Sequence, residues 1–297
     1  MAVTAVRPIV LAVLAVLAGS AAAQDKADKP ARNGLDGPAK ALFGGKKGPA
    51  DMTARSIGFY TRGCLAGGLA LPVDGPNWQV MRLSRNRNWG HPNLIRMLER
   101  LAEQAPKLGW PGLLVGDLAQ PRGGPMLTGH ASHQVGLDAD VWLTPMPDRV
   151  LSRQEREDTS AINMVASDGN DIDPAVWTPQ HVAIIRAAAL APDAERVLVN
   201  PAIKKALCRD ARGDRSWLAK VRPYYRHEFH MHIRIPCPKG DPCKPQDPPP
   251  GGDGCGKELD WWFSDAARKP PKTPIKPRPP LRLADLPPSC RVVLTAP

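Results

Sequence analysis

Hydrophobic periodicity predicts a small number of amphipathic helices. Residues 92–102 have apolar side chains at helical spacing, with Pro92 near the start and Gly109 beyond the end; these side chains are Leu94, Ile95, Leu98, Leu101 and Ala102. Thr178-Pro179 and Asn200-Pro201 each combine an N-cap residue with a proline that suits the first helical turn. The pattern therefore predicts one helix over 92–102 and two further helix starts.

Short apolar runs predict strands between these helices. The runs are residues 78–83, 113–115 and 197–199. Two further segments alternate with a period of two, which gives a strand one apolar and one polar face. The polar faces hold Asp138, Asp140 and Trp142 on a strand from about Leu137, and His230, His232 and Arg234 between Met231, Ile233 and Ile235. Because helices and strands follow no regular βαβ order, the sequence predicts an α+β fold.

The N-terminal residues have the pattern of an export signal. Arg7 precedes an apolar stretch at residues 9–17, and a run of alanines follows at 21–23. Residues 1–23 are interpreted as a signal peptide, and the alternative of a tethering helix is weakened because the apolar stretch is short for a membrane span. Residues 24–56 lack periodicity and predict a flexible leader. The folded domain is expected over 57–297.

Composition excludes a wholly disordered chain and internal membrane spans. The 297 residues are 42% hydrophobic and 23% charged, and no internal stretch approaches the roughly 20 apolar residues that a span needs. Lys and Arg total 40 against 29 Asp and Glu, a formal charge of +11. This charge favours anionic partners. Nucleic-acid binding is disfavoured by export and by the lack of interleaved basic and aromatic residues.

Proline and cysteine predict long irregular connections held by disulfides. Prolines concentrate in residues 236–280, which predicts an extended segment laid over the surface and pinned by a disulfide near Cys290. The six cysteines contain no CxxC pair, so disulfides in an oxidising compartment are favoured over a zinc ribbon or a redox motif. Spacing leaves their pairing open, although Cys237 and Cys243 form the easiest local loop.

Histidines indicate the chemistry, because five of the seven fall in two clusters at residues 129–142 and 226–235. His133 in a loop, a carboxylate on the first polar strand and a histidine on the second can converge on one ion. Three nitrogen and oxygen ligands with a fourth position open are typical of catalytic zinc. A lone His-x-His on a strand is more often a packed or surface pair. The acidic residues around Asp168 and Asp171 fit either a cation site or a solvated loop.

The histidine pattern resembles the LAS group of zinc peptidases, which combine His-x6-Asp with a later His-x-His. A closer resemblance is to the penicillin-insensitive murein endopeptidases of the bacterial periplasm. It runs from about Ile57 to Cys290 and rests on the motifs at 81–87, 115–117, 121–125, 129–142 and 227–235. The resemblance implies a LAS- or hedgehog-like antiparallel sheet with flanking helices and long Pro-rich loops.

Carried over to this chain, the resemblance implies a zinc site. His133, Asp140 and His232 would be the ligands, His130 would line the site and approach a metal, and His230 would act as acid and base beside it, with His227 or Arg226 holding a substrate carboxylate or the oxyanion. Zinc lowers the pKa of water toward about 7 and polarises the scissile carbonyl. The implied disulfides are Cys64 with Cys290, Cys208 with Cys255, and Cys237 with Cys243.

The implied substrate is peptidoglycan, cut at D-alanyl–meso-diaminopimelyl cross-links in the periplasm of a Gram-negative bacterium. Arg85, Arg87 and Arg122 are candidate clamps for its carboxylates. Two alternatives stay open: a D-Ala-D-Ala carboxypeptidase with the same metal chemistry, and a cell-wall-binding protein without catalysis. The preference between 4-3 and 3-3 cross-links, the number of metals and the oligomeric state are not determined by the sequence.

Overall fold

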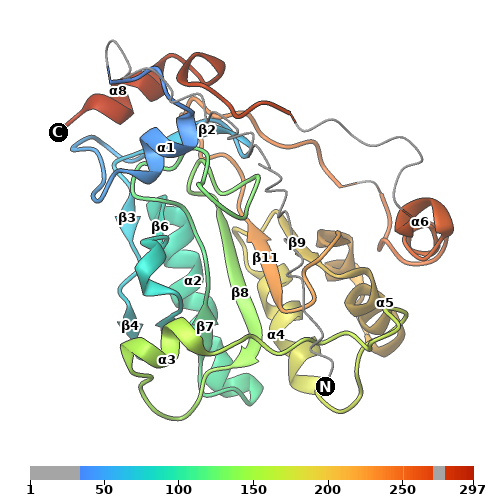
Figure 1. Ribbon diagram of the computed structural model, residues 1–297. Coiled ribbons are helices and arrows are strands. Elements are labelled where there is room, and N and C mark those ends of the chain that lie inside the picture. Colours follow the sequence, from blue (N-terminus) through green and yellow to red (C-terminus); the bar gives the residue numbers. More distant parts are fainter. Residues whose placement is uncertain (1–33, 250, 270–277) are drawn as a thin grey trace, which may run out of the picture.

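The computed structural model describes residues 34–249, 251–269 and 278–297 (Figure 1). The predicted signal peptide and the first part of the predicted leader lie outside these residues. In the described residues, no helix combines the length and apolar character needed to cross a membrane.

A seven-stranded sheet forms the centre of the molecule. Its strand order is β10 (Val221–Pro223), β9 (Arg196–Val199), β11 (His230–Arg234), β8 (Asp138–Pro145), β7 (Leu113–Val115), β5 (Trp78–Val80) and β4 (Asp74–Gly75). The central pairings are antiparallel, but β10 with β9 and β5 with β7 are parallel. The fold is therefore α+β as predicted, whereas the sheet is mixed rather than wholly antiparallel.

The period of two gives this sheet two different faces. Val141 on β8 and Met231 and Ile233 on β11 are fully buried in the main core. That core also contains the apolar faces of α2 (Pro92–Gln104) and α4 (Pro179–Leu190), which cover this side of the sheet (Figure 1). The alternate residues of β8 and β11 point to the opposite face, where the histidine and carboxylate side chains gather.

The predicted helices and strands are present, with shifted ends. α2 begins at Pro92, with His91 as its N-cap, and α4 and α5 (Pro201–Asp210) begin at the two predicted prolines. The strand predicted at 78–83 ends at Val80 instead, because Arg82 adopts a left-handed backbone with φ 57°. The other elements are β1 (Arg55–Phe59), β2 (Arg62–Ala66), β3 (Leu69–Ala70), β6 (Trp89–Gly90), α1 (Ala39–Gly44), α3 (Arg153–Asp158), α6 (Lys257–Trp261), α7 (Asp265–Arg268), α8 (Ser289–Thr295) and the 3-10 turns at 83–85, 105–108, 216–220 and 283–285.

A second, smaller core joins the two ends of the described chain. Ala39 and Phe43 on α1 are fully buried against Cys290 and Val293 on α8, and Ile57 on β1 completes the contact. The prediction of a flexible leader over 24–56 is therefore wrong for its described part. The segment looked structureless because its apolar residues bury against the distant C-terminal helix rather than against each other.

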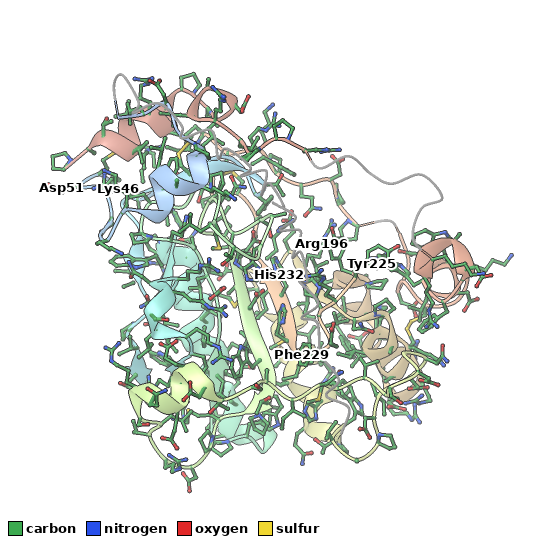
Figure 2. All side chains as sticks on the ribbon, viewed as in Figure 1. Lys46, Asp51, Arg196, Tyr225, Phe229 and His232 are labelled. Carbon is green, nitrogen blue, oxygen red and sulfur yellow. A yellow bond between two sulfur atoms is a disulfide. The ribbon has the colours of Figure 1, made fainter. Side chains whose placement is uncertain are left out.

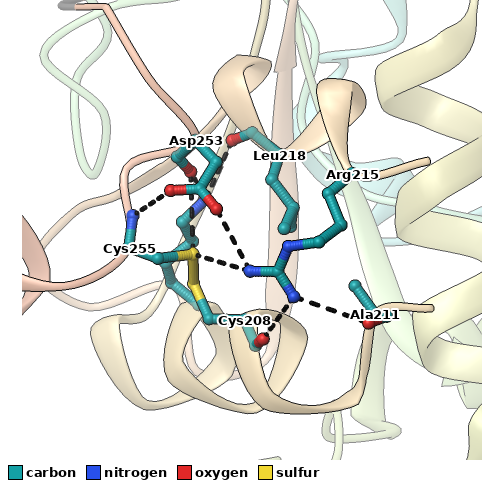
Figure 3. The surroundings of a disulfide bond; sticks show 7 residues. Cys208, Ala211, Arg215, Leu218, Asp253 and Cys255 are labelled. Carbon is teal, nitrogen blue, oxygen red and sulfur yellow. Dashed lines mark hydrogen bonds and ion pairs between the residues drawn. A yellow bond between two sulfur atoms is a disulfide. The ribbon is translucent and has the colours of Figure 1, made fainter. Parts of the chain in front are cut away.

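Three disulfides hold the long connections, and they join the pairs implied by the resemblance. They are Cys64–Cys290, Cys208–Cys255 and Cys237–Cys243. The first ties α8 to β2. Around the second, Arg215 donates to the carbonyl of Cys208 and to the carboxylate of Asp253, so the segment before α6 is fastened to α5 by both covalent and polar contacts (Figure 3).

Candidate metal centre

Strand register brings the predicted ligands together. β11 pairs with β8 so that His230 lies opposite Trp142, His232 opposite Asp140, and Arg234 opposite Asp138. Side chains directly opposite each other on one sheet face have Cβ atoms about 5 Å apart. The period of two and the antiparallel register thus place His232 beside Asp140 on the face that the helices do not cover.

His133 and His130 reach the same point from the loop before β8. His133 has a left-handed backbone with φ 66°, and its N–H donates to the carboxylate of Asp138 at 3.0 Å. His130, His133 and Asp140 each present a ligand atom, and these three atoms lie within 4.8 Å of one another. The structure therefore unites the two histidine clusters that are separate in the sequence.

The two oxygens of Asp140 face different pairs of imidazoles. Oδ1 lies 3.4 Å from His133 Nε2 and 3.1 Å from His232 Nδ1. Oδ2 lies 3.4 Å from His130 Nδ1 and 3.5 Å from His230 Nε2. The deeper side, with Oδ1, has fully or nearly fully buried histidines, while His130 and His230 are 25% and 22% exposed at its mouth.

The deeper side has the properties of a cation site. In the described part of the chain, both ring nitrogens of His133 and Asp140 Oδ1 are buried without a hydrogen-bond partner. Orphaned buried polar atoms cost free energy, and a cation ligated by His133 Nε2 and Asp140 Oδ1 would remove that cost for these two atoms. Imidazole nitrogen and carboxylate oxygen are suitable ligands for a divalent transition metal. The residues present therefore fit a metal ion.

Asp138 orients the site from beneath. Its fully buried carboxylate accepts from His232 Nε2 at 2.9 Å and from Arg234 Nε at 2.6 Å. With Nε2–H donating to Asp138, His232 Nδ1 carries the lone pair that faces Asp140. A carboxylate behind a metal-binding imidazole is the usual outer partner of such sites. The sequence analysis placed Asp138 on the polar face but gave it no role.

Electrostatics keeps the carboxylates ionised. Although burial opposes ionisation, the charge of Arg234 lowers the pKa of Asp138 well below its usual range, and His230 and His133 do so for Asp140. Burial lowers the pKa of His133, which favours the neutral imidazole that a metal requires. Burial acts in the same sense on His232, but the charges and hydrogen bonds of Asp138 and Asp140 together outweigh it and raise its pKa to about 9. A metal bound at Nδ1 would therefore displace a proton from this ring.

His227 stands next to this group. Its Nδ1 donates to the Tyr225 carbonyl at 2.8 Å, and its ring centroid is 4.9 Å from that of His230. Burial and the neighbouring His230 and His232 lower its pKa to about 4, so it is neutral near pH 7 with Nε2 free to accept. Both Arg226 and His227 have left-handed backbones, with φ 61° and 63°, and such strain is concentrated at functional sites.

A polar pocket of about 260 Å³ opens in front of Asp140. Arg85 lines it and is held by a 3.0 Å ion pair with Asp117, which also accepts from His130 Nε2 at 3.1 Å. Burial opposes ionisation of Asp117, but His130 and Arg85 lower its pKa to about 2. The sequence analysis gave no role to three residues that line this pocket, which are Arg82, Asp117 and Phe229. The position of Asp117 just after the strand at 113–115 is the one signal that could have indicated it.

Two predicted carboxylate clamps are structural instead. Arg122 is buried and donates to carbonyls near the chain's end, including Val293 at 2.9 Å and Ala296 at 2.6 Å. Arg87 is also buried and pairs with Asp117 at 2.8 Å. All three guanidinium nitrogens of Arg122 are engaged by main-chain carbonyls, and Arg87 is buried against Asp117 and Thr128, so in this structure neither side chain is presented to a substrate carboxylate. Arg226 is exposed on the loop before β11, near His227.

The acidic loop is not arranged as a second cation site. Arg209 donates twice to the Asp171 carboxylate, at 2.8 and 3.0 Å, and Lys205 adds a 3.3 Å ion pair. Asp168 accepts from Asn170 of its own turn. The alternative of a solvated loop, here neutralised by lysine and arginine, is the one that fits.

A buried histidine–carboxylate cluster with freer imidazoles at the mouth of a polar pocket fits an enzyme site that could hold a metal ion. Sequence comparison makes the class specific: residues 56–295 match the family model described as penicillin-insensitive murein endopeptidase. The chain belongs to this family of peptidases.

Individual relatives agree with this assignment. Proteins named penicillin-insensitive murein endopeptidase are 45% identical in Klebsiella pneumoniae, over 83% of this chain and 88% of theirs, and 44% identical in Yersinia enterocolitica, over 83% and 87%. The relative of that name in Haemophilus influenzae is 46% identical over 76% of this chain and 81% of its own length.

Proposed function

We propose that this protein is a zinc-dependent endopeptidase of the LAS type that hydrolyses D-alanyl–meso-diaminopimelyl cross-links of murein in the periplasm. The family name supplies the substrate class. The observation that carries the metal dependence is the convergence of His133 Nε2 and His232 Nδ1 on Asp140 Oδ1, all deeply buried, with Asp140 Oδ1 and both ring nitrogens of His133 lacking a hydrogen-bond partner within the described chain.

In this proposal the ligands are His133, Asp140 and His232. The third ligand is His232 rather than His130 because His232 presents its nitrogen to the orphaned Oδ1, while His130 faces Oδ2 and is held by Asp117. A zinc ion here would supply Lewis-acid polarisation of the scissile carbonyl and acidify water. Nitrogen and oxygen donors suit zinc among the common divalent ions.

The remaining histidines handle protons. His230 lies at the mouth of the site, 22% exposed and 3.5 Å from Asp140 Oδ2, where it can accept a proton from water and return it to the leaving amine. His227, neutral and with its Nδ1–H donated to the Tyr225 carbonyl, can accept a hydrogen bond at Nε2 beside it. Arg85 projects into the pocket from its pair with Asp117 and can hold a stem-peptide carboxylate.

Metal removal tests this function. Purified dimeric muropeptides incubated with the protein should yield monomers, chelation should abolish this cleavage, and one equivalent of zinc should restore it. His230→Ala is expected to retain zinc and lose about 100-fold or more in turnover. Leu190→Ala, a change on an exposed position of α4, serves as the control.

Three results would contradict the proposal. Cleavage that persists in metal-free protein would refute the metal dependence. Release of terminal D-alanine without loss of dimers would identify a carboxypeptidase. Binding to sacculi without any hydrolysis would identify a wall-binding protein.

A further inference from the structure

Exposed aromatic side chains gather in two short segments of this chain. In the described residues, the aromatic side chains that are more than a third exposed are Tyr224 at 51%, Tyr225 at 48%, Phe229 at 37% and Trp261 at 49%. The first three lie in the loop that leads into β11, and the last lies at the end of α6. Such a concentration of exposed apolar surface marks an interaction site.

These segments form one continuous surface. The ring centroids of Tyr225 and Trp262 are 4.8 Å apart, those of Tyr224 and Trp262 are 6.4 Å apart, and those of Trp261 and Trp262 are 5.2 Å apart. We call Tyr224, Tyr225, Trp261 and Trp262 the aromatic platform. Loop and helix are far apart in the sequence, so the fold itself assembles this surface.

The platform begins at the proposed active site. The ring centroid of Tyr224 is 5.7 Å from that of His227, which is in turn 4.9 Å from His230. In Figure 2, Tyr225 is labelled on the side of His232 that faces the helix α6 seen in Figure 1. A ligand that occupies the pocket can therefore continue over the platform without leaving the surface.

The part of the chain that carries the tryptophans is held firmly. The Cys208–Cys255 disulfide fastens it to α5, and Arg222 of β10 forms an ion pair with Glu258 of α6. Beyond the tryptophans, the hydroxyl of Tyr225 donates to the carbonyl of Ala267 at 3.0 Å. Because this surface is already held in place, it loses little conformational entropy when it binds a ligand.

We infer that the aromatic platform binds the glycan strand of murein while the metal centre acts on the attached peptide. This inference rests on the proposed function. Sugar rings of the glycan have apolar C–H faces, which bury well against aromatic faces, and hydroxyl edges, which suit the phenol and indole donors of Tyr and Trp. The platform thus matches a saccharide in both respects.

The length of the substrate agrees with this placement. A fully extended stem of four residues, from the sugar to the cross-linked D-alanine, spans at most about 14 Å. Tyr224, the near edge of the platform, is reached from His230 by ring-to-ring steps of 4.9 Å to His227 and 5.7 Å to Tyr224, which together are shorter than the extended stem. A peptide bond at the metal centre therefore allows its own sugar to rest on the platform.

Binding to sugar alone tests the inference independently of catalysis. The probe is murein glycan strands from which the peptides have been removed, with affinity measured from tryptophan fluorescence. Tyr224→Ala and Trp261→Ala should each weaken binding about 5- to 10-fold. Tyr224→Phe keeps the ring and loses only the hydroxyl, so it should weaken binding less than Tyr224→Ala does. Leu190→Ala, at an exposed apolar position on α4, should bind like the unchanged protein. Thermal unfolding must be the same for all variants, because both platform side chains are half exposed.

Activity on matched substrates provides the second measurement. Tyr224→Ala and Trp261→Ala should lower kcat/KM about 5- to 10-fold on dimers that carry their disaccharides, and less than twofold on the same dimers freed of sugar. If the unchanged protein bound glycan but neither it nor any variant cleaved the dimers, the proposed function would be contradicted, whereas the inference about the platform would still hold. Equal losses on both substrates, no loss on either, or a platform effect seen only in binding to lipid vesicles or in self-association would overturn the inference.

Discussion

At the scale of single residues, Asp138 decides how the metal centre is built. Its buried carboxylate accepts from the backbone N–H of His133, from the ring of His232 and from the guanidinium of Arg234. One side chain thus fixes a loop ligand, a strand ligand and the neighbouring cation. Arg234 in turn lies over the ring of Tyr60, with its guanidinium carbon 3.9 Å from the centroid. The protein's own hydrogen bonds therefore orient the residues proposed as ligands.

Asp138→Asn tests this role. The amide can accept only on its oxygen, so one of the present donors meets an NH2 group and the orientation of His232 is lost. We expect metal affinity to fall about 10- to 100-fold, measured by competition with a chromogenic chelator. Asp168→Asn, in the exposed acidic loop, is the control and should bind metal normally. Unchanged affinity in Asp138→Asn would show that the carboxylate does not orient the site.

Lys204 is a second buried residue, and it predicts a pH dependence of stability. Its Nζ donates to the carbonyls of Leu218 at 2.8 Å and Asp253 at 2.5 Å. Burial, with the charge of Arg222 adding to it, lowers the pKa of Lys204 from 10.5 to about 7. Between these two values the unfolded chain binds a proton that the folded chain does not. This group therefore makes the folded state more stable as pH rises from about 7 toward 10.

The change that reveals it is Lys204→Met, compared with the exposed neighbour Lys205→Met. In urea unfolding between pH 7.5 and 9, the free energy of unfolding of the unchanged protein should rise relative to that of Lys204→Met by on the order of 1 kcal/mol per pH unit. The difference in free energy of unfolding between the unchanged protein and Lys205→Met should not change with pH over the same range. Parallel curves for both variants would mean that Lys204 keeps an ordinary pKa.

At the scale of elements, the sequence predicted the two strands that carry the candidate site better than it predicted the start of the folded domain. The alternation around His232 and Asp140 is local, so it gave both strands and their polar faces. The pairing register of these two strands, which puts His232 opposite Asp140, could be seen only in the structure. Phe43 shows the limit: one aromatic residue among glycine and lysine gives no periodicity, and its partners lie on α8, about 250 residues away.

Arg122 is the polar counterpart of that contact between chain ends. It donates to the carbonyls of Val293, Leu294 and Ala296, where α8 ends, and to Gly48 after α1. From sequence it resembles any other arginine in a Gly- and Pro-rich motif. Only the docking of the C-terminal helix makes it a clamp for main-chain carbonyls.

Arg122→Ala should therefore destabilise the fold without touching the substrate. Several buried carbonyls lose a charged donor, which costs about 3 kcal/mol or more and loosens α8. Denaturant unfolding gives the stability, and hydrogen exchange should show faster opening confined to α8 and α1. At a temperature where both proteins are folded, KM should be unchanged. Arg85→Ala should have the opposite effect, a raised KM with little change in stability. If Arg122→Ala raised KM instead, Arg122 would be a substrate clamp after all.

At the scale of the whole molecule, the sheet separates packing from chemistry. One face is sealed by α2 and α4, and the other carries the metal centre, the pocket with Arg85 and, further along, the aromatic platform. The chain has a formal net charge of +11. Attraction to a carboxylate-rich polymer is then a property of the molecule as a whole, whereas sugar recognition is a property of one surface.

Salt separates these two contributions. Long-range attraction is screened as the Debye length falls from roughly 20 Å in dilute buffer to about 6 Å near 0.3 M salt. KM for intact sacculi should therefore rise several-fold over this range while kcat stays constant, and the rise should vanish for sacculi whose carboxylates have been amidated. Tyr224→Ala should raise KM by the same factor at every salt concentration, because stacking of a ring on a sugar is not screened. If KM for native sacculi were independent of salt, the positive charge would have no part in finding the substrate, and the pocket and platform alone would account for recognition.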